Sequence, residues 1–512
     1  MSAATQGRIL LATPTSETIG AADFLREKGG TAAYFLLFAA VWALYFAISE
    51  SPSAINQSMA EAYAWGQEFQ LGYNQHPPFW AWICGAWFLV FPHTNWAFGL
   101  LSALNCTIGL WGAWLLIGLL ARGAERTAAT ALLLATPFYT VMGYGFNANI
   151  IFVSVWPWTL YFFVRSIETP KKLEAVWLGL MLGAAILSKY YALILWATCF
   201  FAALRHPARK AYFGSIRPYL SLAVALALLA PHVAWLIANG APPLRYFGHV
   251  SHLGYAAAFH NAISTLLGSV AENAVAIALL LYAAKLSPRE AVSIVRARLS
   301  DPRIQVIAIL ALAPLVLSLA ACLAFQSKLV TPMLQGTFSL VPLLAIEALG
   351  RRNMVRVERF ALRFAVAAMI AAVPLAAAVG ASWVWLSDNP KVTEPRIEIA
   401  ATATQLWREK TGLPLAYVGG SYALGDAVAF YSPDHPHSFE SLDYSRRLWV
   451  TPERLAAHGL LSICLATDKD CLDATARYVT PASSRSEVRL AHTAWGRAFA
   501  PVQLVMTIIP PR

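Results

Sequence analysis

Apolar residues gather along the first 386 residues in eleven stretches separated by short polar segments. The stretches are 31–48, 95–120, 127–143, 150–165, 173–188, 189–204, 219–238, 262–284, 305–324, 333–348 and 364–386. A helix that crosses a bilayer needs about 20 mostly apolar residues, and each stretch reaches or approaches that length. The pattern predicts a mainly α, polytopic membrane domain over residues 1–386, with about 11 transmembrane helices.

A further apolar run at 78–92 is shorter, begins at a proline and is rich in tryptophan. Counting it as a span would reverse the side of every later loop. The basic clusters at 205–217, 285–303 and 350–363 would then lie outside, although Lys and Arg usually collect in cytoplasmic loops. We therefore predict an interfacial or re-entrant helix at 78–92, a cytoplasmic N-terminus and a periplasmic loop at 49–82.

Residues 387–512 have a different character. Segments such as LAYVGGSYA and LLSICLAT alternate with helical stretches such as TATQLWREK. The pattern predicts a small C-terminal α/β domain, which is periplasmic because it follows an odd number of spans. Residues 425–444 are expected to form an exposed loop. Cys464 and Cys471 either form a disulfide in an oxidising compartment or stay reduced.

Composition supports a membrane protein. Hydrophobic residues make up 58% of the chain and charged residues 13%, with a mean hydropathy of +0.54, whereas soluble domains are about 25% charged. The net charge of +11 comes from the loops of the membrane part. This location favours the cytoplasmic-loop bias over nucleic-acid binding. The N-terminus lacks the long apolar core of a signal peptide and is expected to be a short cytoplasmic tail.

The loop at 49–82 carries the first candidate chemistry. Glu61 and Glu68 are seven residues apart, so a helix over 57–69 would place them on one face, where either carboxylate can accept a proton. His76 precedes two prolines in the same loop. Polar and acidic groups directly after a first membrane helix indicate a reaction site at the membrane surface.

Aromatic and amide side chains offer further substrate contacts. The aromatic candidates, which either stack on sugar rings or anchor the chain at the interface, are Tyr63, Trp65, Tyr73 and Trp80. Asn147 and Asn149 lie in a short outer loop, where their amides either bind a substrate or cap a helix.

Three basic residues are predicted on the same side as the 49–82 loop: Lys189, Arg245 and Lys328. They either bind an anion, most simply a lipid phosphate, or extend to the headgroups. Tyr246 and His249 share the outer loop of Arg245. The His249-x-x-His252 spacing suits a metal-ligand pair, but no third ligand is evident, and substrate contact is the other interpretation.

Three motifs resemble those of a known family. LGYNQHPPFWAW at 71–82, FNANIIFVSVWPW at 146–158 and LSKYYALILW at 187–196 are similar to segments of the bacterial family 39 glycosyltransferases. These integral-membrane GT-C transferases are related to protein O-mannosyltransferases, to the aminoarabinose transferase acting on lipid A and to rhizobial lipid A and core galacturonosyltransferases. The resemblance covers the membrane region best and implies a GT-C fold.

The resemblance also implies a function. A polyprenyl-phosphate sugar would donate its sugar, with inversion, to a glycolipid or glycan acceptor at the periplasmic face of a bacterial inner membrane. The family's first-loop Asp falls near Ser58, and its frequent Lys before His-Pro-Pro is Gln75 here. Glu61 is then the best remaining carboxylate. Membrane lipids are expected partners and nucleic acid is not.

Other functions stay open. A lipid or sugar transporter would predict broken or charged mid-membrane helices and a two-fold repeat, neither of which is clear. An inactive scaffold of the same fold is favoured by the missing Asp near Ser58. The outer loops hold no Asp-x-Asp pair, so we do not expect a strict metal requirement, with a divalent metal kept as the alternative cofactor.

Overall fold

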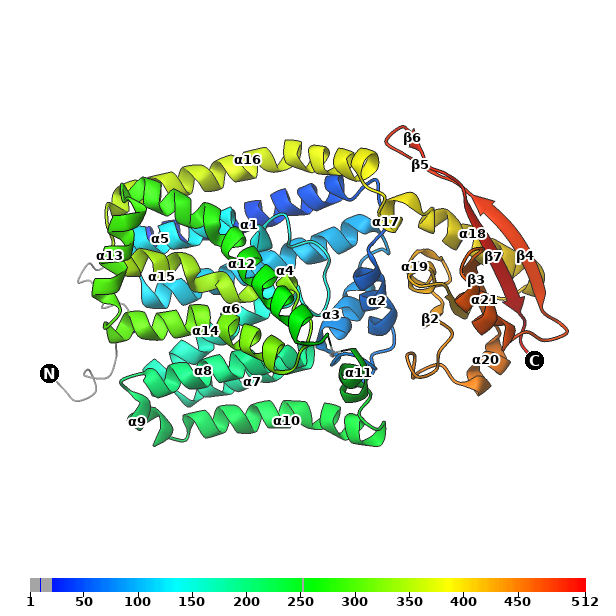
Figure 1. Ribbon diagram of the computed structural model, residues 1–512, viewed down its shortest axis with the longest axis horizontal. Helices are drawn as coiled ribbons and strands as arrows, with labels where there is room; N and C mark the ends of the chain where they lie inside the picture. The colour runs from blue at the N-terminus through cyan, green and yellow to red at the C-terminus, as the bar shows by residue number, and fades with distance from the viewer. Residues whose placement is uncertain (1–9, 11–20, 251–252) are drawn as a thin grey trace.

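The computed structural model describes residue 10 and residues 21–250 and 253–512 (Figure 1). The helices of the first part are α1 (Ala21–Ser49), α2 (Gln57–Gly66), α3 (Phe79–Phe88), α4 (Asn95–Leu120), α5 (Gly123–Leu132), α6 (Phe152–Glu168), α7 (Lys172–Ser188), α8 (Leu193–Arg205), α9 (Arg209–Phe213), α10 (Arg217–Ala238), α11 (Pro242–Val250), α12 (Tyr255–Ala284), α13 (Pro288–Arg298), α14 (Pro302–Ala324), α15 (Val341–Ala348) and α16 (Met354–Leu386). Short 3₁₀ helices are η1 (Leu133–Ala135), η2 (Pro137–Tyr139), η3 (Tyr190–Ala192), η4 (Thr331–Met333) and η5 (Gln335–Leu340).

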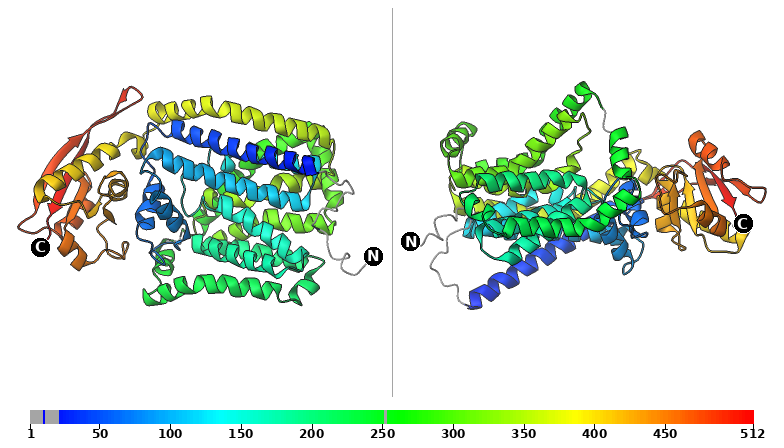
Figure 2. Two further views of the ribbon diagram at one scale, coloured as in Figure 1. Left: turned by 180° about the vertical axis from the view of Figure 1, so that it is seen from behind. Right: turned by 90° about the horizontal axis from the view of Figure 1, so that it is seen from below.

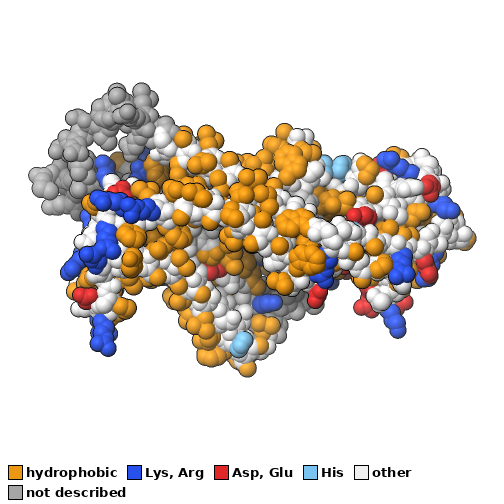
Figure 3. All heavy atoms as spheres, turned by 90° about the horizontal axis from the view of Figure 1, so that it is seen from above, with side chains coloured by type: hydrophobic (Ala, Val, Ile, Leu, Met, Phe, Trp, Pro, Cys, Tyr) orange, Lys and Arg blue, Asp and Glu red, His pale blue; other side chains and the backbone are white. Residues whose placement is uncertain are grey.

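The predicted helical membrane architecture is confirmed. A helical segment lies in every one of the apolar stretches read from the sequence. Among the described helices, six are long and apolar enough to cross a membrane: Gly30–Ser49, Asn95–Leu120, Arg217–Ala238, Tyr255–Ala284, Pro302–Ala324 and Met354–Leu386. Hydrophobic side chains cover the middle of the molecule, as a lipid-facing surface requires (Figure 3).

The helix at 78–92 is present as α3 and has ten residues. At a rise of 1.5 Å per residue it is about 15 Å long, half the thickness of a hydrocarbon core. It packs against α2, and a Cβ added to Gly66 would lie 2.4 Å from the carbonyl oxygen of Ala81. Only a glycine therefore allows α2 and α3 to approach so closely.

The bundle has two chemically different ends. The basic segments around α9 and α13, and the start of α16, lie at one end, whereas α2, α3, α11 and the C-terminal domain lie at the other (Figures 1 and 2). α7 and α8 meet through η3 at the second end, which places the turn at Lys189 beside α3. This separation agrees with the loop alternation expected from charge.

The C-terminal domain is built on a five-stranded sheet in the order β2-β1-β3-β7-β4, with a separate β5–β6 hairpin. Its helices are α17 (Pro390–Thr393), α18 (Arg396–Thr411), α19 (Leu424–Tyr431), α20 (Pro452–His458) and α21 (Lys469–Ala476), and its strands are β1 (Tyr417–Gly420), β2 (His437–Glu440), β3 (Leu460–Leu465), β4 (Ser484–Leu490), β5 (Thr493–Ala494), β6 (Arg497–Ala498) and β7 (Val502–Ile509). β2, β1 and β3 are parallel, with Val418 opposite both Ser438 and Leu461. β7 runs antiparallel between β3 and β4.

Two sequence expectations for this domain are decided by the structure. Cys464 of β3 and Cys471 of α21 form a disulfide, with their Cα atoms 5.7 Å apart. The expectation of an exposed loop at 425–444 is wrong, because this stretch contains the buried helix α19 and the strand β2. Its acids Asp426 and Glu440 are buried and pair with Arg447 and with Gln57 of the first loop.

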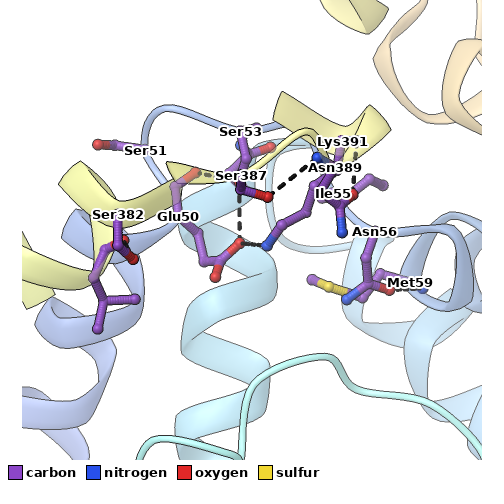
Figure 4. Close-up of polar contacts among 12 residues, drawn as sticks. Glu50, Ser51, Ser53, Ile55, Asn56, Met59, Ser382, Ser387, Asn389 and Lys391 are labelled. Carbon is purple, nitrogen blue, oxygen red and sulfur yellow. Dashed lines mark hydrogen bonds and ion pairs between the residues drawn. The ribbon is translucent and has the colours of Figure 1, made fainter. Parts of the chain in front are cut away.

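The two parts of the chain are held together by polar contacts at the end of α1. Glu50 and Lys391 point toward one another, and their Oε2 and Nζ atoms are 2.6 Å apart (Figure 4). The amide of Ala54 donates to the carbonyl of Lys391 at 2.7 Å. The amide of Ile55 donates to the hydroxyl of Tyr431 at 2.8 Å. These contacts dock the C-terminal domain against the loop that leads into α2.

Candidate active site

The helix α2 presents the first candidate carboxylate. Asn56 caps its start by accepting a hydrogen bond from the Met59 amide at 3.0 Å. Gln57, Glu61 and Trp65 follow at spacings of four residues, so they form one stripe along the helix. This stripe faces the C-terminal domain at Gln57 and the His76 loop at Trp65.

The loop after α2 packs on Trp65. The Tyr73 ring stacks on Trp65 with centroids 4.7 Å apart, and its hydroxyl donates to the Trp65 carbonyl at 2.6 Å. The His76 ring lies 6.1 Å from the rings of both Trp65 and Trp80. Burial, together with the positive charge of Lys189, lowers the pKa of His76 to about 3. His76 is therefore a neutral hydrogen-bonding group at physiological pH.

Lys189 brings a cation to the same place. It lies at the break between α7 and η3, where its extended backbone ends the helix. Its ammonium group donates to Oδ1 of Asn149 at 2.7 Å. Because this charge acts on both His76 and Glu61, three segments that are distant in sequence meet here: α2, the His76 loop and the α7–η3 turn.

Glu61 is only partly exposed, and its surroundings change its proton affinity. Burial raises the pKa of Glu61 to about 8; Arg447 opposes this shift, Glu440 and Asp426 reinforce it, and Lys189 opposes it more weakly. A carboxylate with this pKa is poised to exchange a proton near neutral pH.

A buried charge cluster of the C-terminal domain lies beside Glu61. Arg447 donates from Nη2 to Oδ1 and Oδ2 of Asp426, at 2.9 Å and 2.8 Å, and also to Glu440. The amide of Gln57 donates to Asp426 at 3.0 Å and to Glu440 at 2.7 Å. Sequence reasoning missed this cluster, because its members come from the stretch expected to be a loop and from the segment after it.

The other first-loop candidates lie elsewhere. Glu68 shares a hydrogen bond with Nδ1 of His437, 2.7 Å away, at the domain interface. Tyr63 and Tyr73 are 4% and 1% exposed and belong to the aromatic core, which favours a structural role over stacking on a sugar. Ser58 is exposed on α2.

Of the remaining outer-loop candidates, one has a structural contact and the others are exposed or lie outside the described residues. Asn147 caps a turn, since its side chain accepts from the amides of Asn149 and Ile150 at 2.8 Å and 3.2 Å. Arg245 and Tyr246 are exposed on α11, and Tyr246 lies near enough to Glu61 for that carboxylate to raise the tyrosine's pKa, secondary to burial. Lys328 is exposed. The side chain of His249 and the whole of His252 lie outside the described residues.

No group of three or more His, Cys, Asp or Glu side chains is arranged to hold a metal ion within the part of the chain that the structure describes. The three carboxylates near Arg447 are instead neutralised in part by that guanidinium and by hydrogen bonds.

Comparison with known proteins gives a consistent picture. Residues 75–235 match the family described as dolichyl-phosphate-mannose-protein mannosyltransferase. The lipopolysaccharide core galacturonosyltransferase RgtB of Rhizobium johnstonii is 27% identical over 220 residues, which is 40% of this chain and 42% of that relative. The chain thus matches less than half the length of this relative.

Two solved structures of ArnT from Cupriavidus metallidurans share the fold. The structure bound to undecaprenyl phosphate gives a TM-score of 0.59 at 14% identity, and the apo structure gives 0.58 at 15%. Each comparison covers 93% of this chain and 98% of the other. The resemblance seen in the sequence is confirmed, because all these proteins are GT-C glycosyltransferases of family 39. The family match contains His76, Asn149 and Lys189 but begins after Glu61.

Proposed function

We propose that this protein transfers a sugar from a polyprenyl-phosphate donor to a glycolipid or glycan acceptor of the bacterial envelope, at the periplasmic face of the inner membrane. The GT-C fold supports the general class. The name of the rhizobial relative and the undecaprenyl phosphate bound to ArnT support an envelope acceptor and a polyprenyl lipid.

One arrangement carries the proposal: α2, which bears Glu61, packs on α3, and α3 packs on α7, which ends at Lys189, so a carboxylate and a cation meet at the same end of the bundle. The reaction needs a base for the acceptor hydroxyl and a cation for the phosphate that leaves. A carboxylate with a pKa near 8 and a lysine held by Asn149 supply these two groups.

The chemistry follows from this pair. The oxygen of the acceptor hydroxyl forms a bond to the anomeric carbon of the sugar. At the same time, the carboxylate of Glu61 accepts the proton of that hydroxyl. The bond between that carbon and the phosphate oxygen breaks, and polyprenyl phosphate leaves with the electron pair. Lys189 offsets the negative charge that develops on the phosphate. A single displacement of this kind inverts the anomeric carbon.

His76 and Asn149 have supporting roles in this proposal. His76 is neutral, so it offers a hydrogen bond to a sugar hydroxyl without repelling Lys189. Asn149 fixes the position of the lysine ammonium by accepting one of its hydrogen bonds at 2.7 Å. Pre-positioning of this kind lowers the barrier because the groups do not have to be ordered during the reaction.

Mass spectrometry of lipid A, core and other envelope glycans, with and without this gene, tests the proposal and names the acceptor. We expect one sugar to be missing in the deletion strain, restored by the wild-type gene and not by Glu61→Gln. A full set of sugars in every lipid, glycan and protein fraction of the deletion strain would refute the transferase and favour an inactive scaffold.

A further inference from the structure

The stripe on α2 points at the C-terminal domain along its whole length. Gln57 bridges Asp426 and Glu440, with distances of 3.0 Å and 2.7 Å. One turn later, Glu61 comes under the charges of both acids and of Arg447. After another turn, the Trp65 ring lies 5.7 Å from the Arg447 guanidinium.

The cluster lies at a particular edge of the small sheet. Glu440 is the last residue of β2, and the loop that follows β1 turns back over it, since the Ala423 amide donates to Glu440 at 3.1 Å. Ala423 itself has a φ of +71°, a left-handed conformation that is strained for a residue with a Cβ. The carboxyl ends of parallel strands are the edge where α/β sheets bind their ligands. Here that edge faces Glu61.

The Arg447 side chain is buried and held by two aromatic rings and two acids. It is 2% exposed, and its guanidinium carbon lies 5.7 Å from the Trp65 ring and 5.5 Å from the Trp449 ring. Its Nη2 atom serves both Asp426 and Glu440, whereas its buried Nε atom has no hydrogen-bond partner among the described residues. A buried donor left unpaired is costly, so this N–H is a group that a nearby carboxylate ion would satisfy.

The charges in the cluster do not balance. Burial and the neighbouring Asp426 raise the pKa of Glu440, and once Glu440 is ionised the two acids exceed the single positive charge of Arg447. Lys189 is the cation on the membrane side of Glu61, and the tyrosines 246 and 422 also lie within electrostatic reach of that carboxylate. Removing one acid of the cluster therefore takes away a negative charge near Glu61 and should lower the pKa of Glu61.

We infer that the C-terminal domain completes the catalytic site, with Arg447, held by Asp426 and Glu440 and packed on Trp65, as the residue that positions Glu61. This inference rests on the proposed transferase function. It means that the domain is an obligatory part of the catalytic unit, and that the membrane domain alone holds only half of the site.

The pH dependence of sugar transfer by Glu440→Gln tests the inference. In this variant a negative charge that disfavours the ionised form of Glu61 is removed. We expect the acidic limb of the rate profile to move to lower pH by about one unit. Arg447→Lys keeps the positive charge but loses the planar guanidinium that binds two carboxylates at once, so we expect the rate of sugar transfer to fall about tenfold or more. The acidic limb of its rate profile should stay within a few tenths of a pH unit of the wild-type position.

Two controls separate this effect from general damage. Lys391→Met breaks another contact between the domains, the pair with Glu50, and should reduce stability without moving the limb. Glu487→Gln removes an exposed charge on β4 and should change neither the stability of the protein nor the pH of the acidic limb. If Glu440→Gln does not accumulate in membranes, Asp426→Asn removes the second acid of the same cluster and should move the limb in the same direction.

The outcomes are distinguishable. The inference would be overturned if the acidic limb of the rate profile stayed at the wild-type pH in both Glu440→Gln and Asp426→Asn. It would also be overturned if both variants failed to fold while Arg447→Lys transferred sugar at the wild-type rate. Either result would leave the proposed transferase function intact. Absence of transfer by the wild-type protein would refute the proposed function itself.

Discussion

Glu61 shows how much one residue's chemistry depends on its neighbours. Burial and two carboxylates favour its protonated form, whereas Arg447 and Lys189 favour its ionised form. The balance leaves the pKa at about 8, far above that of an exposed glutamate.

This value makes a pH prediction. Glu61 must be ionised to act as a base, so the transfer rate should rise as pH approaches 8. Burial lowers the pKa of Lys189 to about 8, so the rate should fall again at higher pH, where Lys189 loses the charge that offsets the leaving phosphate. Because the pKa of Glu61 is raised on folding, the folded state binds more protons than the unfolded state between about pH 4.5 and 8, and stability falls as pH rises through this window. A rate profile, with thermal unfolding of Glu61→Gln against wild type at pH 6 and pH 8, checks both. A Glu61→Gln variant that gains no relative stability at pH 8 would contradict the assignment.

Lys189 carries the second residue-scale prediction. Lys189→Met removes the cation held by Asn149, and we expect kcat/KM for the lipid-linked donor to fall about a hundredfold or more. Lys210→Met, an exposed lysine on α9 at the other end of the bundle, should match wild type. Equal losses in the two variants would point to a general effect of charge on the protein.

At the scale of elements, the site depends on the close contact of α2 and α3. A methyl group at Gly66 would lie 2.4 Å from the Ala81 carbonyl and 2.6 Å from the Gly85 amide, both of them backbone atoms. Gly66→Ala should therefore destabilise the protein by about 1–3 kcal/mol, measured by thermal unfolding in detergent. Gly30→Ala, where nothing lies within 4 Å, serves as the control. An unchanged Gly66→Ala would mean that the two helices do not touch.

Sequence reasoning succeeded for the elements that the bilayer dictates. The apolar stretches all contain helical segments, and the short run at 78–92 is a ten-residue helix. It failed at 425–444, where turn-forming and charged residues indicated a loop. Asp426 and Glu440 are buried there because Arg447 and Gln57 pair with them. The pairing with Arg447 forms when the C-terminal domain folds, and the pairing with Gln57 forms when that domain docks on α2; neither leaves a local pattern in the sequence.

The same limit applies to the candidate site. Glu61, His76, Asn149 and Lys189 were predicted as candidates because polar groups at the ends of membrane helices are unusual, and they remain the candidates of the proposed site. The sequence left two roles open for Tyr63 and Tyr73, because an aromatic residue in a polar loop has the same local pattern whether it contacts a sugar or the core; their burial favours the core. Arg447 lies 386 positions after Glu61, and only the fold brings the two together.

For the whole molecule, the separation of charge along the bundle predicts its orientation. The basic segments lie at the end opposite the C-terminal domain (Figures 1 and 3). We propose that this basic end is cytoplasmic. In intact cells, a membrane-impermeant thiol reagent that crosses the outer membrane should label Glu487→Cys on β4 and should label Lys210→Cys on α9 only after permeabilisation. The reverse labelling would invert the topology and place the proposed site on the wrong face.

The assignment of Glu61 as the base is tested by sugar transfer from a polyprenyl-phosphate donor, catalysed by the purified full-length protein and compared between Glu61→Gln and Glu68→Gln. Glu61 faces the cations of the site, whereas Glu68 is paired with His437. We predict that Glu61→Gln reduces kcat by about 10²–10⁴-fold, while Glu68→Gln keeps most of the wild-type kcat. An active Glu61→Gln variant would contradict the account.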